Sequence, residues 1–226
     1  RVKSYAMAER MTNHVLSQIL YHQLNMKKYF EAQKEKKWLN EIEPILNSKI
    51  TIGILGLGFL GSFVANKLHK SGYNVLGFKN SKIKKKYLFK VYAHKDNLKK
   101  FINKCDVVVN ILPSTNDTQN IINKSFLNKM KKNALFINVG RGSAVNEKDL
   151  IFHLKKHKEF CASLDVFITE PLSKSSPFWK LKNVLITPHV ASLTVIDDAV
   201  NHMYMKFLDY QKNGKIKNEV NIKKGY

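Results

Sequence analysis

The sequence predicts an α/β fold, a Rossmann-type doubly wound parallel sheet, on three observations. An apolar run at residues 49–55 leads directly into a G-x-G-x-x-G turn formed by Gly56, Gly58 and Gly61. A helical pattern at residues 62–70 and a second apolar run at 73–78 follow the turn. Strand-like and helix-like segments then alternate along the chain, which is typical of a parallel sheet with helices on both faces.

The chain opens with a helical pattern over residues 5–38. Met7, Met11, Val15 and Ile19 form one apolar row at helical spacing, so we expect one long packing helix. Two histidines of this segment, His14 and His22, fall on its polar side and are expected to be exposed to solvent.

The glycine turn that follows matches a dinucleotide-binding fingerprint. The first glycine permits the tight turn, the second lets a pyrophosphate approach the backbone, and the third lets the helix pack on the strand. The helix N-terminus supplies free N–H groups and a positive dipole end for phosphates. A purely structural glycine turn is the alternative interpretation.

The remaining elements follow from apolar runs and capping residues. The expected strands are residues 91–92, 106–112, 134–138, 161–167 and 184–186. The expected helices are 96–104 capped by Asp96, 126–130 capped by Ser125, 146–156 capped by Asn146 with Asp149 in a capping box, and a last helix opened by Thr194 with Asp197 and closed by Gly214.

Three ionisable residues of different kinds follow three of these strands: Arg141, Glu170 and His189. Ligands bind at the carboxyl ends of parallel strands, so we expect the three to converge beside the nucleotide. A guanidinium can hold the carboxylate and carbonyl of a 2-keto acid. An imidazole can donate a proton near neutral pH, and a paired carboxylate orients it. Taken singly, each residue could instead be an ordinary surface or structural group.

Four motifs in order make the chain resemble a known family, the D-isomer-specific 2-hydroxyacid dehydrogenases, and residues 177–179 (PFW) with the ending Gly225-Tyr226 resemble most its glyoxylate/hydroxypyruvate reductase A branch. The four motifs are the glycine turn, residues 138–142 (NVGRG), residues 164–171 with LDVF and Glu-Pro, and residues 187–192 (TPHVAS). The resemblance implies NAD(P)-dependent reduction of glyoxylate or hydroxypyruvate, with Arg141 binding substrate, His189 as acid/base and Glu170 as its partner. It also implies a homodimer and cofactor contacts from Phe59, Leu60, Thr118, Val139, Gly140 and Asp165, besides Arg141 and His189.

The cofactor is expected to be NADP(H) in preference to NAD(H). Family members that use NAD place an acidic residue after the second strand, whereas here Lys79, Asn80, Ser81 and Lys82 follow it. A lysine with small polar groups suits a 2′-phosphate. The alternative is that Lys79 is one more solvated lysine, and NAD use stays possible.

The expected domain organisation has three parts. Residues 1–45 form a linker helix belonging partly to a substrate-binding domain, residues 46–192 the NAD(P)-binding domain, and residues 193–226 a C-terminal helix and tail. Nothing in the sequence matches the N-terminal part of that substrate domain. We therefore expect the apolar faces of the first and last helices to be exposed, favouring self-association. An inactive remnant and a nucleotide-binding interaction module of the same family are the alternative functions.

Composition excludes other classes. The net charge is +22, but only three of the 39 basic residues are arginine, and the lysines are spread over the chain. A solvated lysine-rich surface is therefore expected rather than nucleic-acid binding, with residues 82–86 the one local patch kept open. No apolar run is long enough to span a membrane. No metal site is expected, and two cysteines, Cys105 and Cys161, suggest buried thiols in a reducing compartment, the cytoplasm.

Overall fold

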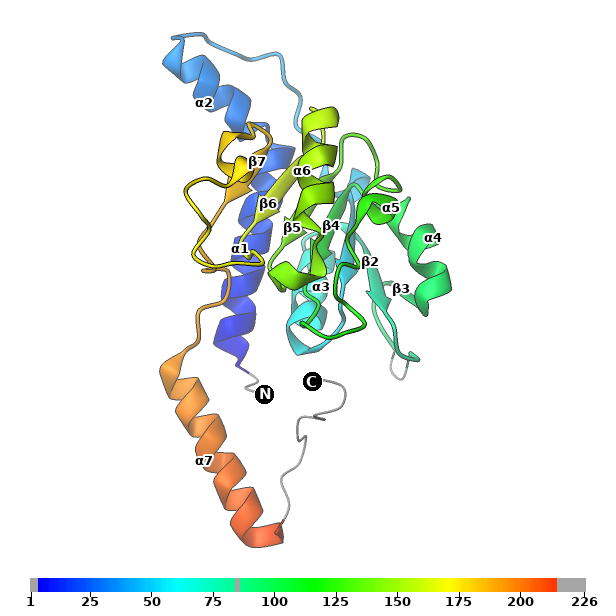
Figure 1. The fold of residues 1–226 in the computed structure, drawn as a ribbon, viewed down its shortest axis with the longest axis vertical. Helices are drawn as coiled ribbons and strands as arrows, with labels where there is room; N and C mark the ends of the chain where they lie inside the picture. The colour runs from blue at the N-terminus through cyan, green and yellow to red at the C-terminus, as the bar shows by residue number, and fades with distance from the viewer. Residues whose placement is uncertain (1–3, 84–85, 215–226) are drawn as a thin grey trace.

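The computed structural model describes residues 4–83 and 86–214 and contains one seven-stranded, fully parallel sheet (Figure 1). The strand order is β3-β2-β1-β4-β5-β6-β7, so the order reverses between β1 and β4. This confirms the doubly wound α/β prediction. The strands are β1 (Thr51–Leu55), β2 (Asn74–Lys79), β3 (Lys90–Ala93), β4 (Val107–Asn110), β5 (Leu135–Asn138), β6 (Cys161–Leu164) and β7 (Val184–Ile186).

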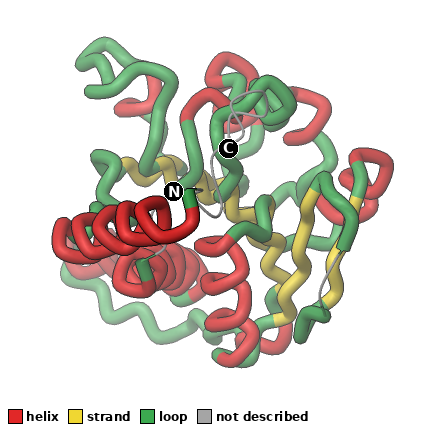
Figure 2. Tube along the Cα trace, turned by 90° about the horizontal axis from the view of Figure 1, so that it is seen from below, coloured by secondary structure: helices red, strands yellow, loops and turns green. Residues whose placement is uncertain are grey.

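Helices cover both faces of the sheet, as Figure 2 shows. They are α1 (Tyr5–Gln23), α2 (Met26–Lys34), α3 (Phe59–Lys70), α4 (Leu98–Ile102), α5 (Lys124–Leu127), α6 (Glu147–Lys156) and α7 (Ile196–Asn213). Two apolar cores result. One joins α1 and α3 to the sheet, and the other joins α4, α5 and α6 to it.

The side-chain alternation of the strands divides these cores. In β4, Val107 and Val109 belong to the α1/α3 core, whereas Val108 belongs to the other. All three are buried, which explains the continuous apolar run that marks this strand in the sequence.

The first helix differs from the prediction in two ways. It breaks after Gln23, because Asn25 adopts a left-handed conformation with φ 54°, so α1 and α2 are separate helices. The apolar row of α1 is also not exposed. Val15 and Ile19 pack into the core beside α3, and burying each contributes about 2 kcal/mol.

The two histidines of α1 are only partly exposed, because the helix lies against the sheet. Burial lowers the pKa of both His14 and His22.

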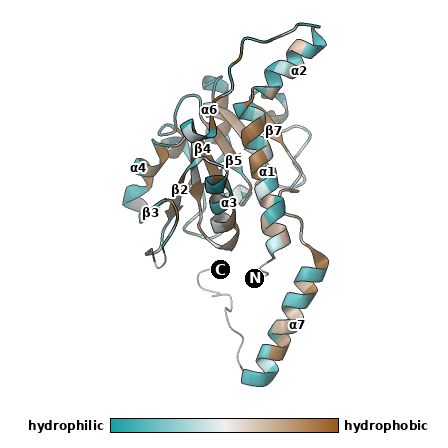
Figure 3. Cartoon of the chain, turned by 180° about the vertical axis from the view of Figure 1, so that it is seen from behind, coloured by the Kyte–Doolittle hydropathy of each residue, from teal (hydrophilic) through white to brown (hydrophobic). Residues whose placement is uncertain are grey.

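The last helix, by contrast, is exposed as expected. α7 extends away from the sheet (Figures 1 and 3), and none of its residues is buried. Its large apolar side chains include Ile196, Met203 and Phe207, which are 75%, 60% and 54% exposed.

Several predicted boundaries shift. The glycine-turn helix begins at Phe59 rather than at residue 62, and the strands predicted at 106–112 and 161–167 end at Asn110 and Leu164. The apolar runs continue into the loops that follow, because Val166 and Phe167 after β6 are buried and Ile111 and Leu112 after β4 are partly buried.

Three predicted caps are wrong. The helix predicted from Asp96 is a 3-10 turn followed by α4, with Asn97 at the cap position. Asn123, not Ser125, caps α5, and Val195 rather than Thr194 precedes α7. Adjacent polar residues compete for a cap, and the sequence does not tell which one adopts extended backbone.

The predictions for the remaining helix ends are partly confirmed. Asn146 caps α6 as predicted, and Gly214 ends α7 in a left-handed conformation. Asp149 does not close a capping box, because its carboxylate accepts a hydrogen bond from the Lys124 amide.

Other predictions concern the chain outside the cores. Both cysteines are free thiols, but only Cys105 is buried and Cys161 is partly exposed. Within residues 4–83 and 86–214, no helix is both long and apolar enough to cross a membrane. Residues 84–85 of the lysine patch and the tail from residue 215 lie outside the described residues.

Candidate active site

The glycine turn leaves an open surface at the start of α3. Gly56 has φ 101°, and a Cβ added at Gly61 would lie 1.9 Å from the Gly56 carbonyl oxygen, so helix and turn touch directly. At Gly58 an added Cβ would meet nothing within 4 Å. No side chain caps α3, so its first N–H groups face this open space. The first and third glycines are required by packing, whereas the second keeps the approach to the backbone clear.

Two asparagines tie the next loops together. Asn110 and Asn138 end β4 and β5 at the same register position, and Nδ2 of the first donates to Oδ1 of the second at 2.8 Å. Asn138 Oδ1 also accepts from the Gly140 amide at 3.3 Å. A Cβ at Gly140 would lie 2.8 Å from the Leu112 carbonyl oxygen, so only glycine lets the two loops pack this closely.

The Arg141 loop in turn rests on the loop after β6. A Cβ at Gly142 would lie 2.0 Å from the carbonyl carbon of Phe167. The Arg141 side chain is exposed, and its Nη1 donates to the Gly140 carbonyl at 2.7 Å. The structure therefore places the arginine and the Glu170 loop on adjoining segments of one sheet edge.

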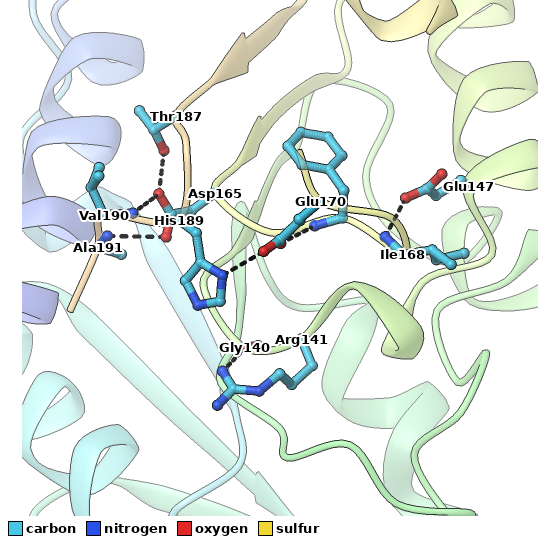
Figure 4. A network of polar contacts seen from close by, with 11 residues as sticks. Gly140, Arg141, Glu147, Asp165, Ile168, Glu170, Thr187, His189, Val190 and Ala191 are labelled. Atoms are coloured by element: carbon cyan, nitrogen blue, oxygen red, sulfur yellow. Dashed lines mark hydrogen bonds and ion pairs between the residues drawn. The ribbon is translucent and has the colours of Figure 1, made fainter. Parts of the chain in front are cut away.

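Glu170 and His189 form a pair (Figure 4). Oε2 of the glutamate lies 2.7 Å from Nδ1 of the histidine, and Oε1 accepts from the Phe167 amide at 2.8 Å. Partial burial would raise the pKa of Glu170, but the hydrogen bonds from His189 and Phe167 outweigh it and lower that pKa. The carboxylate is thus held ionised and oriented toward the imidazole.

A second carboxylate holds the His189 loop in place. Asp165 is buried, and its Oδ1 accepts from the Thr187 hydroxyl at 2.6 Å and the Val190 amide at 2.9 Å. Its Oδ2 accepts from the Ala191 amide at 3.0 Å. His189 itself has φ 55°, a left-handed conformation that costs of order 1 kcal/mol or more and persists only where surrounding contacts fix it.

The other predicted cofactor residues are distributed along the same edge. Lys79 is the last residue of β2, with Asn80 and Ser81 exposed just beyond it. Phe59 and Leu60 form the first turn of α3, and the Phe59 ring packs edge-on against Tyr5 at 5.4 Å.

The side chains of two further predicted cofactor residues contact other parts of the protein. Val139 is buried in the core that α1 and α3 share with the sheet. The Thr118 hydroxyl donates to the Pro113 carbonyl at 2.6 Å, so it shapes the loop after β4.

The sequence interpretation missed the Asn110–Asn138 pair and the loop-holding contacts of Asp165. The sequence could have indicated the pair, because each asparagine ends a buried apolar run, where a polar side chain needs a hydrogen-bond partner. No sequence pattern indicates the contacts of Asp165, because its partners are mainly backbone amides of a loop more than 20 residues further along the chain.

A switch-point glycine turn with an oriented imidazole, a carboxylate and a guanidinium beyond neighbouring strands defines an NAD(P)-dependent dehydrogenase. The sequence profile of the D-isomer specific 2-hydroxyacid dehydrogenase, NAD binding domain, matches residues 16–191, and the chain belongs to this family.

Two similar curated proteins are both named glyoxylate/hydroxypyruvate reductase A. Glyoxylate/hydroxypyruvate reductase A of Yersinia enterocolitica is 32% identical over 228 residues, covering all of this chain and 72% of that protein. The protein of the same name from Escherichia fergusonii is 34% identical over 226 residues, with the same coverage.

Solved structures agree in fold. A D-isomer specific 2-hydroxyacid dehydrogenase from Xanthobacter autotrophicus Py2, in complex with NADPH and MES, superposes with a TM-score of 0.93 at 32% identity, covering 100% of this chain and 93% of that one. The NADPH-dependent glyoxylate/hydroxypyruvate reductase of Sinorhizobium meliloti, in complex with NADP and sulfate, gives 0.92 at 31% identity, covering 99% and 71%.

Proposed function

We propose that the protein reduces small 2-keto acids with NADPH, converting glyoxylate to glycolate and hydroxypyruvate to D-glycerate. The observation that carries this proposal is the 2.7 Å contact between Glu170 and His189, at the sheet edge that also carries the glycine turn and Arg141. The names of the curated relatives support the choice of substrates.

The residues present fit a dinucleotide. The open space at Gly58 and the uncapped start of α3 suit a pyrophosphate. Lys79 with Asn80 and Ser81 suits a 2′-phosphate, and no acidic residue competes there for a ribose hydroxyl. The neighbours from Xanthobacter and Sinorhizobium, which hold NADPH and NADP, support the same preference.

The residues divide the chemistry between them. When bound, the reduced nicotinamide supplies a hydride to the keto carbon of the substrate. Arg141 binds the substrate carboxylate through its guanidinium and fixes the carbonyl in position. The protonated His189 donates its proton to the oxygen as it becomes an alkoxide, through the Nε2 that Glu170 leaves free. Glu170 keeps the imidazole oriented, so that the same nitrogen can take up a proton again after each turnover.

We also propose the assignment of segments. Residues 46–192 serve as the nucleotide-binding unit, with Phe59, Leu60, Gly140 and Asp165 near the cofactor. Residues 1–45 and 193–226 connect this unit to substrate-binding parts. The working form is a homodimer in the cytoplasm.

The proposal is tested in two steps. Fluorescence titration measures NADPH and NADH binding, and NADPH oxidation is then followed with glyoxylate and with hydroxypyruvate. We expect tighter NADPH binding and turnover of both keto acids. His189→Gln keeps the size and polarity of the side chain, so it should bind NADPH normally and lose turnover. NADPH binding without turnover in the wild type would contradict the reductase and favour the interaction module or the remnant.

A further inference from the structure

Helix α1 holds the segment that follows His189. The Ser192 hydroxyl donates to the Met7 carbonyl at 2.9 Å, and Nη1 of Arg10 donates to the Leu193 carbonyl at 3.0 Å. Met11 packs in the same apolar core as Ala191. The helix thus contacts the loop on both its polar and its apolar sides.

Further along, α1 and β6 present polar side chains to one another in register. Ser163 and Asp165 are two residues apart along the chain at β6, so their side chains share one face of the sheet. His14 and Gln18 are four apart and share one face of α1. The buried Ser163 hydroxyl donates to Gln18 Oε1 at 3.0 Å. His14 lies one turn before Gln18 on this face, and the negative charge of Asp165 acts to raise its pKa.

Both His14 and Asp165 have an atom that can form a further hydrogen bond. Nε2 of His14 has no contact with solvent and no hydrogen-bond partner, alone in this respect among the buried side-chain nitrogens and oxygens of the described residues. Oδ1 of Asp165 has two donors, but Oδ2 has only the Ala191 amide. A carboxylate oxygen accepts two hydrogen bonds, and leaving a buried nitrogen without a partner is destabilising.

The charge state of His14 suits a donor to this carboxylate. Burial lowers the pKa of His14, and the negative charge of Asp165 opposes that shift. A neutral imidazole carries one N–H, and placing it on Nε2 supplies a donor at the buried nitrogen without adding a buried charge.

We propose that His14 is a positioning residue of the reductase site, whose Nε2–H pairs with Oδ2 of Asp165 and so fixes the carboxylate that shapes the His189 loop. The neighbouring Gln18–Ser163 contact already joins the same face of the helix to the same face of the strand. The pair links α1 to the acid/base histidine through two steps, from His14 to Asp165 and from Asp165 to the amides of Val190 and Ala191. The expected effect on turnover rests on the proposed function, whereas the His14–Asp165 hydrogen bond does not.

Hydrogen exchange of the Val190 and Ala191 amides, followed residue by residue by NMR in the whole chain, tests the pair directly. His14→Gln keeps an amide nitrogen near the position of Nε2, whereas His14→Asn places it near that of Nδ1. We expect exchange about tenfold faster than wild type in His14→Asn and in His14→Leu, and close to wild type in His14→Gln, because one hydrogen bond to a charged group is lost or kept.

The matched control is Gln18→Leu, which removes the neighbouring polar contact of the same helix face. It should leave the exchange of both amides unchanged. Equal exchange in His14→Asn and His14→Gln, or equal acceleration in the control, would overturn the pairing. If His14→Leu does not fold, the comparison of Asn with Gln decides alone.

Kinetics then separates the two claims. In an active enzyme, His14→Asn should lower kcat about tenfold with little change in KM, and His14→Gln should restore it. A wild type without turnover would contradict the proposed function and leave the exchange test of the His14–Asp165 pair standing.

Discussion

Oε2 of Glu170 lies 2.7 Å from Nδ1 of His189, although 19 residues separate them along the chain. This contact fixes which ring nitrogen is free. With Nδ1 bound to the carboxylate, Nε2 is the nitrogen left to meet a substrate. The other Glu170 oxygen is bound to the Phe167 amide, so the carboxylate has little freedom to turn away.

Removing the carboxylate should therefore weaken catalysis while leaving the histidine in place. We expect Glu170→Gln to lower kcat about 10–100-fold, because the imidazole loses the carboxylate that orients it, with NADPH affinity unchanged. Steady-state kinetics with glyoxylate measures this. An unchanged kcat would show that Glu170 has no part in the proton transfer.

The same carboxylate makes stability depend on pH. Its pKa in the folded state lies below the ordinary 4.5, so its contribution is fully present above pH 4.5 and is lost as pH falls through the lower folded value. Thermal unfolding below pH 4.5 should show a smaller acid loss in Glu170→Gln than in the wild type. Glu159→Gln, at an exposed site, is the control and should keep the full acid loss.

Two glycines of the turn should respond oppositely to alanine. Gly61→Ala forces a Cβ to 1.9 Å from a backbone oxygen and should destabilise the fold by about 3 kcal/mol or more. Gly58→Ala meets no atom of the protein, so it should unfold like wild type but bind NADPH more weakly. Denaturant unfolding and cofactor titration measure the two effects, and normal NADPH affinity in Gly58→Ala would place the pyrophosphate elsewhere.

Cofactor choice should depend on Lys79. Lys79→Ala removes one charged donor from the proposed 2′-phosphate site and should weaken NADPH binding about tenfold, with NADH binding unchanged. Lys90→Ala is the control, because that lysine starts the neighbouring strand β3, opposite Leu76 rather than the end of β2, and lies over the Tyr92 ring. Equal losses for both cofactors would show that Lys79 does not contact the 2′-phosphate.

The exposed side of α7 should drive self-association. Replacing Met203 and Phe207 with serine removes two exposed apolar side chains and should shift sedimentation toward the monomer. Gln211→Ser changes an exposed polar residue of the same helix and should have no effect. A wild type that is monomeric at all concentrations would rule out this role for the helix.

The sequence predicted the sheet because its signals are local. Apolar runs, the glycine turn and alternating helices identify parallel strands, and the ends of those strands locate Arg141, Glu170 and His189 at one edge. Their convergence followed from topology, which a parallel sheet determines almost completely.

What the sequence did not reveal depends on contacts distant along the chain. The apolar row of α1 was expected to be exposed, yet Val15 and Ile19 are buried, since no local pattern shows which surface covers a helix. His14 looked like a solvated residue for the same reason. The cap predictions were wrong because neighbouring polar residues such as Asn123 and Ser125 are equally good caps in the sequence, and only the backbone conformation distinguishes them.

The most direct test of the central claim is a single-turnover experiment, in which excess protein bound to NADPH is mixed with glyoxylate. We predict that the wild type oxidises the bound cofactor and forms one glycolate per NADPH consumed, and that His189→Gln slows this step about 100-fold or more while binding NADPH equally well. Equal rates in the two proteins would contradict the assignment of His189 as the proton donor.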